Sequence, residues 1–263
     1  MLKMMQYKLS SIPLWRKILF IIVIVAFVFI DVKGYQGFEL TLLEFIVFHF
    51  NDSKTIDYFY LIIIMIISAD IYNGAQNPYE DMLILKNGGR KKWFIYISIY
   101  TALASFGIIC IYLLVACILG FSSGFLGLHL GAYLTELKNL NSILIIGEIV
   151  MLAGLRIWFL NMLIMSINLF CMNSPMGFLA AFIISIIDMF IYEAFDIMEP
   201  WGIMPLEHTR IIYTEAVAPA VDQFVRFPVG YSVLYWAIGI LTFVVISYRA
   251  ILRKEFLIKN VKY

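Results

Sequence analysis

The sequence predicts an all-α polytopic membrane protein with about six transmembrane helices. Of its 263 residues, 63% are hydrophobic and only 14% are charged, whereas a soluble domain is about 45–50% apolar and about 25% charged. The apolar residues gather in runs of about 20, the length that a helix needs to cross a bilayer. Because the net charge is only +1, overall charge gives no reason to expect a nucleic-acid partner.

The first element is expected to be a short helix over 1–14 that lies on the inner membrane surface. Apolar residues recur there at three- and four-residue spacing, and Lys3 and Lys8 occupy other sides of the helix. Pro13 should end this helix before the first span begins, and Trp15 suits the headgroup level. A frayed terminal tail is the other interpretation of the same residues.

Six segments are long and apolar enough to span the bilayer. We expect spans at roughly 15–33, 56–75, 93–119, 143–171, 175–194 and 229–250. The segment 37–50 is also apolar, but it contains Glu39 and Glu44, so we expect a re-entrant or interfacial helix there. The outer loop 195–228 is too short and too rich in proline to fold alone, so 1–263 is expected to form one transmembrane domain.

The distribution of basic residues predicts the orientation, because cytoplasmic loops of membrane proteins carry an excess of Lys and Arg. With the N-terminus inside, the cytoplasmic segments contain thirteen basic residues and the outer segments five. The inner residues are Lys3, Lys8, Arg16, Lys17, Lys86, Arg90, Lys91, Lys92, Arg249, Arg253, Lys254, Lys259 and Lys262. We therefore expect a multi-pass protein of the plasma membrane with both termini in the cytoplasm.

The cytoplasmic loop 76–92 is expected to contain a well-capped short helix. Asn77 suits the N-cap and Pro78 the first helical position. Glu80 stands three residues after Asn77, as in a capping box, and Glu80 and Asp81 suit the positive end of the helix dipole. Gly88 and Gly89 can end the helix.

The same helix carries four consecutive apolar residues, 82–85, which include Leu83 and Leu85. A simple connection between two spans does not need such a surface. One interpretation is a docking surface for a cytoplasmic partner, and the other is an amphipathic turn that rests on lipid. The residues alone do not favour either interpretation.

With this loop, the chain resembles the permease subunits of ABC transporters of the type-two exporter superfamily. Such permeases have an inner-surface helix, six spans and a coupling helix between the second and third spans. Asp70, Leu83–Leu85, Gly88–Gly89 and Arg90 match the acidic residue, leucine-rich stretch, glycine turn and arginine of that loop. The family often has Glu where this chain has Asp70, which weakens the match at that position.

The resemblance implies a transport subunit without enzymatic activity, catalytic residues or a cofactor of its own. The sequence contains no G-x-x-x-x-G-K-[ST] motif for binding ATP, so ATP and magnesium would belong to a separate cytoplasmic ABC ATPase. A second permease chain would complete the usual assembly of two permeases and two ATPases. The apolar spans favour an amphipathic or hydrophobic cargo, such as a peptide.

Four polar residues are expected within the spans, where an ionisable group costs at least about 2.5–3.5 kcal/mol. They are Glu148, Arg156, Asn161 and Asp188. The short connection near 172–173 predicts an antiparallel hairpin of the fourth and fifth spans, which would bring Arg156 and Asp188 to the same depth. We favour a structural ion pair; a charge that faces the transport path and two groups on different faces are the other interpretations.

Three other function classes deserve comparison with the permease. Gly120–Gly124 matches the G-x-S-x-G motif of serine hydrolases, but it falls at the end of a predicted membrane helix, not in a strand-turn-helix. An intramembrane metalloprotease needs paired glutamates and histidines, which Glu193 and His208 do not provide. A non-enzymatic immunity or scaffold protein that acts without an ATPase is the main alternative.

Overall fold

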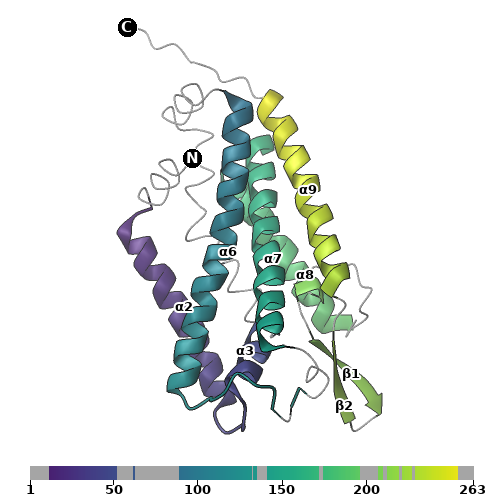
Figure 1. The fold of residues 1–263 in the computed structure, drawn as a ribbon. Coiled ribbons are helices and arrows are strands. Elements are labelled where there is room, and N and C mark those ends of the chain that lie inside the picture. Colours follow the sequence, from purple (N-terminus) through teal and green to yellow (C-terminus); the bar gives the residue numbers. More distant parts are fainter. Residues whose placement is uncertain are drawn as a thin grey trace.

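The helices of the computed structural model run side by side along one long axis (Figure 1). The structure describes residues 12–51, 62, 89–131, 133–134, 141–171, 174–195, 207–209, 212–218, 221–226 and 229–253. In chain order, the described elements are α2, α3, α6, α7, α8, a short 3₁₀ helix η3, the strands β1 and β2, and α9. The described part is therefore mainly helical, as the composition predicts.

Helix α2 (Leu14–Tyr35) begins directly after Pro13, whose extended backbone separates it from the preceding segment. It buries one stripe at four-residue spacing, formed by Phe20, Ile24, Val28 and Val32. The other apolar side chains, such as Ile22 and Ile30, are 57% and 65% exposed. A helix of this kind packs on its neighbours along one stripe and presents the remainder to lipid.

Helix α3 (Leu42–Asn51) follows α2 after a short turn and packs against α2, α6 and α7. Eight of its ten residues are buried, including Glu44 and His49. The helix predicted over 37–50 is therefore present, but it is enclosed by other helices. An interfacial helix would leave one face exposed to headgroups, so the burial favours the re-entrant interpretation.

Helix α6 (Arg90–Ser122) begins immediately after Gly89, whose φ of +94° is easily adopted only by glycine. Its 33 residues correspond to about 50 Å, longer than the roughly 30 Å hydrocarbon core. At its other end, Gly124 has a φ of +96°, and Phe125 N–H donates to the Gly120 carbonyl. This Schellman ending contains the G-x-S-x-G match, so Gly120–Gly124 is a helix terminus.

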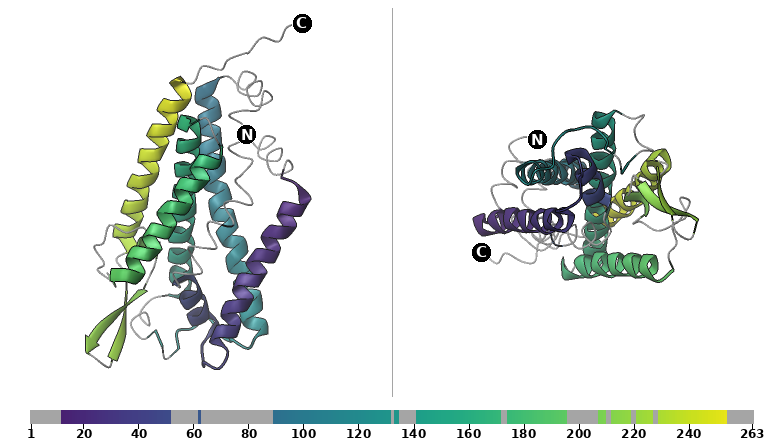
Figure 2. Two further views of the ribbon diagram at one scale, coloured as in Figure 1. Left: turned by 180° about the vertical axis from the view of Figure 1, so that it is seen from behind. Right: turned by 90° about the horizontal axis from the view of Figure 1, so that it is seen from below.

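Helix α7 (Ser142–Cys171) is the central helix of the bundle. It contacts α3, α6, α8, α9 and η3, and Figure 2 shows it between α6 and α9. The side chain of Asn141 caps its start by accepting a hydrogen bond from Ile143 N–H at 3.0 Å. Any polar group in the middle of α7 is consequently enclosed by protein.

Helix α8 (Ser174–Phe195) returns beside α7, as the predicted hairpin requires. Helix α9 (Val229–Arg253) then packs along α7. The approach of α9 is close, because a Cβ on Gly239 would lie 2.8 Å from the ring of Phe159. The glycine therefore lets the two helices meet at this point.

The chain between α8 and α9 contains a two-stranded ribbon that the sequence analysis does not predict. Strands β1 (Ile212–Ala218) and β2 (Val221–Arg226) pair antiparallel, with an irregularity between Ala216 and Ala218. Figure 1 shows the ribbon below α8 and α9, to one side of the bundle. The segment thus forms local structure outside the bundle.

Four described helices are long and apolar enough to cross a membrane: Leu14–Tyr35, Arg90–Ser122, Ser142–Cys171 and Val229–Leu252. They match four of the predicted spans within a few residues and indicate a membrane-embedded protein. The fifth predicted span coincides with α8, in which Met176–Ile187 forms a shorter apolar stretch. The second predicted span, 56–75, and the surface helix 1–14 lie almost entirely outside the described residues.

Candidate functional site

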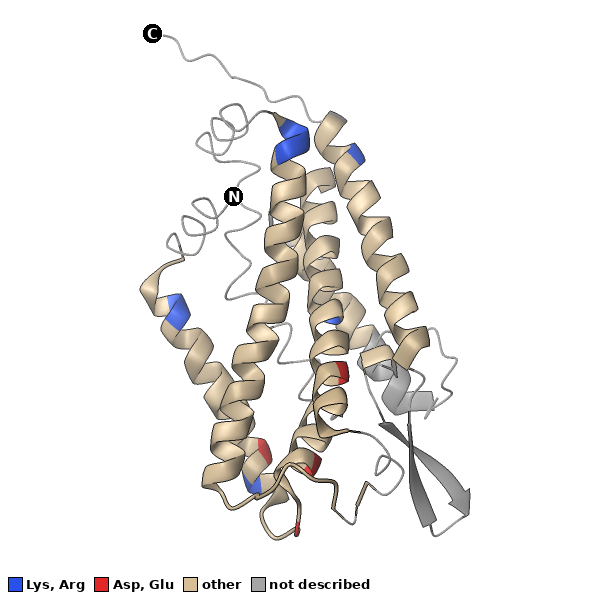
Figure 3. Cartoon of the chain, in the orientation of Figure 1, with Lys and Arg blue, Asp and Glu red and all other residues tan. Residues whose placement is uncertain are grey.

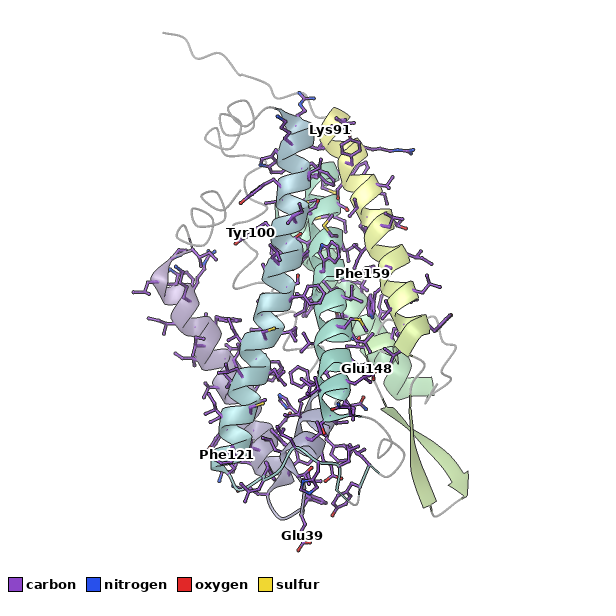
Figure 4. The ribbon with its side chains drawn as sticks, viewed as in Figure 1. Glu39, Lys91, Tyr100, Phe121, Glu148 and Phe159 are labelled. Atoms are coloured by element: carbon purple, nitrogen blue, oxygen red, sulfur yellow. The ribbon has the colours of Figure 1, made fainter. Side chains whose placement is uncertain are left out.

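One end of the bundle, here called the basic end, is formed by the start of α6 and the end of α9. Figure 3 shows Lys and Arg there and Asp and Glu toward the opposite end, and Figure 4 labels Lys91 at the basic end. Arg90 Nη1 donates a hydrogen bond to the Leu252 carbonyl at 3.0 Å. Since helix-terminal carbonyls lack intrahelical donors, Arg90 satisfies one of them and ties α6 to α9.

A ring contact strengthens the same junction one turn further into the bundle. The rings of Phe94 and Tyr248 lie with their centroids 5.5 Å apart. Of the predicted docking residues, only Arg90 belongs to the described part. Asp70, Pro78, Glu80, Asp81, Leu83 and Leu85 lie outside the described residues.

A second polar site lies deep in the bundle, where α7 meets η3 (Glu207–Thr209). Arg156 is only 2% exposed, and its Nη1 donates a hydrogen bond to the Thr209 hydroxyl at 2.9 Å. Arg156 and Thr209 are 53 residues apart in the chain. The contact attaches the segment between α8 and α9 to the centre of α7.

The neighbouring residue, His208, is fully buried and held by α9 through three contacts. Its Nδ1 lies 3.2 Å from the Ser232 hydroxyl, and its carbonyl accepts a hydrogen bond from Trp236 Nε1 at 3.0 Å. The ring of Tyr235 stacks on the imidazole at a centroid distance of 4.0 Å. Together, Arg156, His208, Thr209, Ser232 and Trp236 form what we call the central cluster.

The central cluster supplies hydrogen-bonding groups to a charge that lipid would disfavour. A guanidinium carries five N–H donors, and one of them is satisfied by the Thr209 hydroxyl. The described part of the chain therefore shows a buried cation enclosed between α7, η3 and α9. Such an arrangement can hold a segment in place or present a positive group to a transport path.

Two further intramembrane residues were predicted, Glu148 on α7 and Asp188 on α8. Glu148 is half-buried on α7, and Figure 4 shows it closer to the opposite end than Phe159. At Asp188 the structure describes the α8 backbone, while the side chain lies outside the described residues. The pairing of Arg156 with Asp188 therefore stays a prediction, whereas the contact of Arg156 with Thr209 was not predicted.

Polar side chains also join the helices toward the basic end. Asn161 Nδ2 donates to the Ser105 hydroxyl on α6 at 3.1 Å. Asn168 Oδ1 accepts from Gly177 N–H at the start of α8 at 2.9 Å. The two asparagines thus bind different neighbours, although their seven-residue spacing places them on one face of an ideal helix.

Glu44 is a structural residue that the sequence analysis left unexplained. Its Oε2 accepts a hydrogen bond from Thr41 N–H, and the Thr41 hydroxyl accepts from Glu44 N–H. Glu44 Oε1 also accepts from the N–H groups of Tyr133 and Leu134, at 3.0 and 3.3 Å. The T-x-x-E spacing of a capping box could have identified the first half of this arrangement.

A buried pair of ionisable groups joins α2 to α3. His49 Nδ1 contacts Asp31 Oδ2, with the histidine side chain fully buried and the aspartate side chain 15% exposed. Aromatic rings enclose the imidazole, and Tyr112 of α6 lies 5.0 Å away between centroids. Within the described part, His49 Nε2 has no hydrogen-bond partner. No sequence signal links these two residues, because only the fold brings α2 and α3 together.

No protein-family model matches the chain, and no match was found among curated proteins or solved structures. The interpretation of its function therefore depends on the residues of the chain itself.

Proposed function

We propose that the chain is the membrane-spanning permease subunit of an ATP-driven exporter. The observation that carries this proposal is the sequence of the loop 76–92, which predicts a capped apolar helix, together with the way in which Gly89 and Arg90 join the bundle. Gly89 makes a sharp entry into α6, and Arg90 ties that entry to the end of α9. A movement of the loop would therefore reach α6 and α9 together, and both helices contact α7.

Six membrane crossings with both termini in the cytoplasm fit this function. Helices α2 and α6 run in the same direction along the bundle (Figure 1). The predicted span 56–75 would return the chain from the end of α3 to the start of α6. The excess of basic residues at the end where α6 begins supports a cytoplasmic location for the loop.

The same loop suggests which subunit would perform which step of transport. The chain itself would provide the translocation path, and a cytoplasmic ABC ATPase would dock on 78–86 and bind ATP and magnesium. A second permease chain would complete the path. An amphipathic or hydrophobic cargo, such as a peptide, suits helices that present apolar side chains over most of their surface.

Copurification tests the proposal. The affinity-tagged chain is expressed with its chromosomal neighbours, extracted from membranes in mild detergent, and the bound proteins are identified by mass spectrometry. We expect a P-loop ATPase to copurify in about equal amount and to hydrolyse ATP. A chain that purifies without any such ATPase, while remaining folded and membrane-inserted, would support the immunity or scaffold function instead.

A further inference from the structure

An apolar groove separates α2 from α6 near the start of α2. It has a volume of about 420 Å³ and is lined by Lys17, Phe20 and Ile21 from α2 and by Tyr100, Leu103 and Gly107 from α6, among others. Figure 1 and Figure 2 show that α2 diverges from α6 toward the start of α2. The groove lies where the two helices separate.

The groove is open on one side of the described bundle. Ile21 and Leu103, on opposite walls, are 45% and 50% exposed, so the groove opens to the outside of the described bundle. Among the described residues, a Cβ built on Gly107 would meet no heavy atom within 4 Å. Because α2 and α6 are membrane-spanning by length and composition, the space at Gly107 faces lipid, and an acyl chain would fill it.

The length of the groove along α6 matches the thickness of one leaflet of the hydrocarbon core. On α6 its lining extends from Tyr100 to Ile111, which corresponds to about 16 Å along the helix axis. Half of a hydrocarbon core of about 30 Å is about 15 Å. On α2 the lining residues belong to the first eight residues of the helix, so the groove lies in the leaflet at the start of that helix.

The charged residue in the lining of the groove indicates which kind of lipid headgroup would lie there. Lys17 is the charged residue among its lining side chains. The neighbouring Arg16 places its guanidinium 5.1 Å from the centre of the Trp15 ring, an arrangement suited to the membrane interface. A lysine on a flexible stem can reach the headgroup region above an apolar wall. The groove therefore combines an acyl-chain surface with one positive charge at its end.

We infer that the groove between α2 and α6 binds one acyl chain of an anionic phospholipid, with the phosphate of the headgroup held by Lys17. The basic-residue distribution places this lipid in the cytoplasmic leaflet, where anionic lipids attract basic side chains. The site does not depend on the proposed transport function, because it involves neither the loop 76–92 nor an ATPase.

Two pairs of variants test the site. Lys17→Gln removes the charge, and Lys33→Gln removes a basic residue from the other end of the same helix. Gly107→Leu fills the groove, and Gly147→Leu is its control, because a Cβ on Gly147 also meets no heavy atom within 4 Å in the part of the chain that the structure describes. The full chain is purified from mixtures of phosphatidylglycerol and phosphatidylcholine, and the retained lipids are counted by native mass spectrometry.

The unchanged chain should retain one phosphatidylglycerol, with a preference of about fivefold over phosphatidylcholine. Lys17→Gln should abolish the preference, and Gly107→Leu should abolish retention, while both controls behave like the unchanged chain. Retention that survives Gly107→Leu, or a preference that survives Lys17→Gln, would overturn the assignment. A loss of thermal stability in Gly107→Leu that Gly147→Leu does not share would also overturn it, because protein would then fill the groove.

A photoreactive lipid provides an independent measurement in the unchanged chain. Phosphatidylglycerol with a diazirine in its acyl chain should label the peptide that contains 100–111, and excess unlabelled phosphatidylglycerol should suppress the labelling. Labelling that is uniform over all apolar helices would contradict a defined site. This result does not depend on whether the variants fold.

Discussion

Arg156, in the middle of α7, donates a hydrogen bond to the hydroxyl of Thr209, a residue of the segment that connects α8 to α9. Both side chains are almost completely buried. The contact joins a charge at the centre of a membrane-spanning helix to a segment outside the regular helices. The central cluster is therefore a long-range attachment that holds η3 between α7 and α9.

Replacement of Thr209 by valine tests this attachment. Thr209→Val keeps the side-chain shape but removes the acceptor, so we expect a loss of about 1.5–3 kcal/mol, the usual contribution of a hydrogen bond to a charged group. Thermal unfolding in detergent measures the change. Thr242→Val is the control, because within the described residues the Thr242 hydroxyl bonds to the Ile238 carbonyl one turn earlier on its own helix. Equal stability of the two variants would contradict the attachment.

The predicted pair of Arg156 and Asp188 leads to a second test. Removing one partner of a buried ion pair costs about 3–5 kcal/mol, so Arg156→Gln and Asp188→Asn should each lower thermal stability. The double exchange Arg156→Asp with Asp188→Arg should recover part of the loss. A double variant that is no more stable than the worse single variant would exclude a structural pair. Arg156 would then become a candidate for the transport path.

Glu44 provides a third test, at the opposite end of the bundle. Glu44→Gln replaces one of the two carboxylate oxygens by an NH₂ group, which donates and does not accept, so the side chain can no longer accept from both Thr41 and the pair Tyr133 and Leu134. We expect a loss of about 1.5–3 kcal/mol and faster hydrogen exchange at the amides that lose their acceptor, either Thr41 or the pair Tyr133 and Leu134. Glu39→Gln, at an exposed position, should change neither quantity. Unaltered exchange in Glu44→Gln would show that the cap is not needed.

These residues show where a sequence-based prediction of this protein succeeds and where it stops. The spans are predictable because lipid forces a continuous apolar segment to satisfy its backbone groups as a helix. The burial of α3 cannot be predicted in this way. The buried carboxylate of Glu44 is stabilised by N–H groups that lie about 90 residues further along the chain. Local spacing reveals the capping box but not its long-range partners.

The central cluster was missed for a similar reason. Arg156 is conspicuous in a membrane helix, and its importance can be inferred from the cost of a charge in lipid. Its observed partner, Thr209, is an unremarkable residue in an irregular segment, and the sequence has no other histidine near His208. Their burial depends on the way in which η3 packs between α7 and α9, which no local pattern encodes.

Accessibility to an impermeant thiol reagent tests the topology. In a chain with its three native cysteines replaced, a cysteine at Glu39 should be labelled from outside intact cells. A cysteine at Gly88 should be labelled only after the membrane is opened, because the basic-residue distribution places 76–92 inside. External labelling at Gly88 would reverse the orientation and would falsify the docking proposal.

The central claim is that an ATPase docks on the apolar surface of the loop 76–92. The most direct measurement compares Leu83→Asp and Leu85→Asp with Leu83→Met and Leu85→Met, which preserve apolar volume. For each variant, the amount of ATPase that copurifies and the ATP-dependent export are measured at equal levels of inserted chain. We predict that both aspartate variants lose the ATPase or its coupling to export, whereas both methionine variants retain them. Full ATPase association and full export in both aspartate variants would contradict the account.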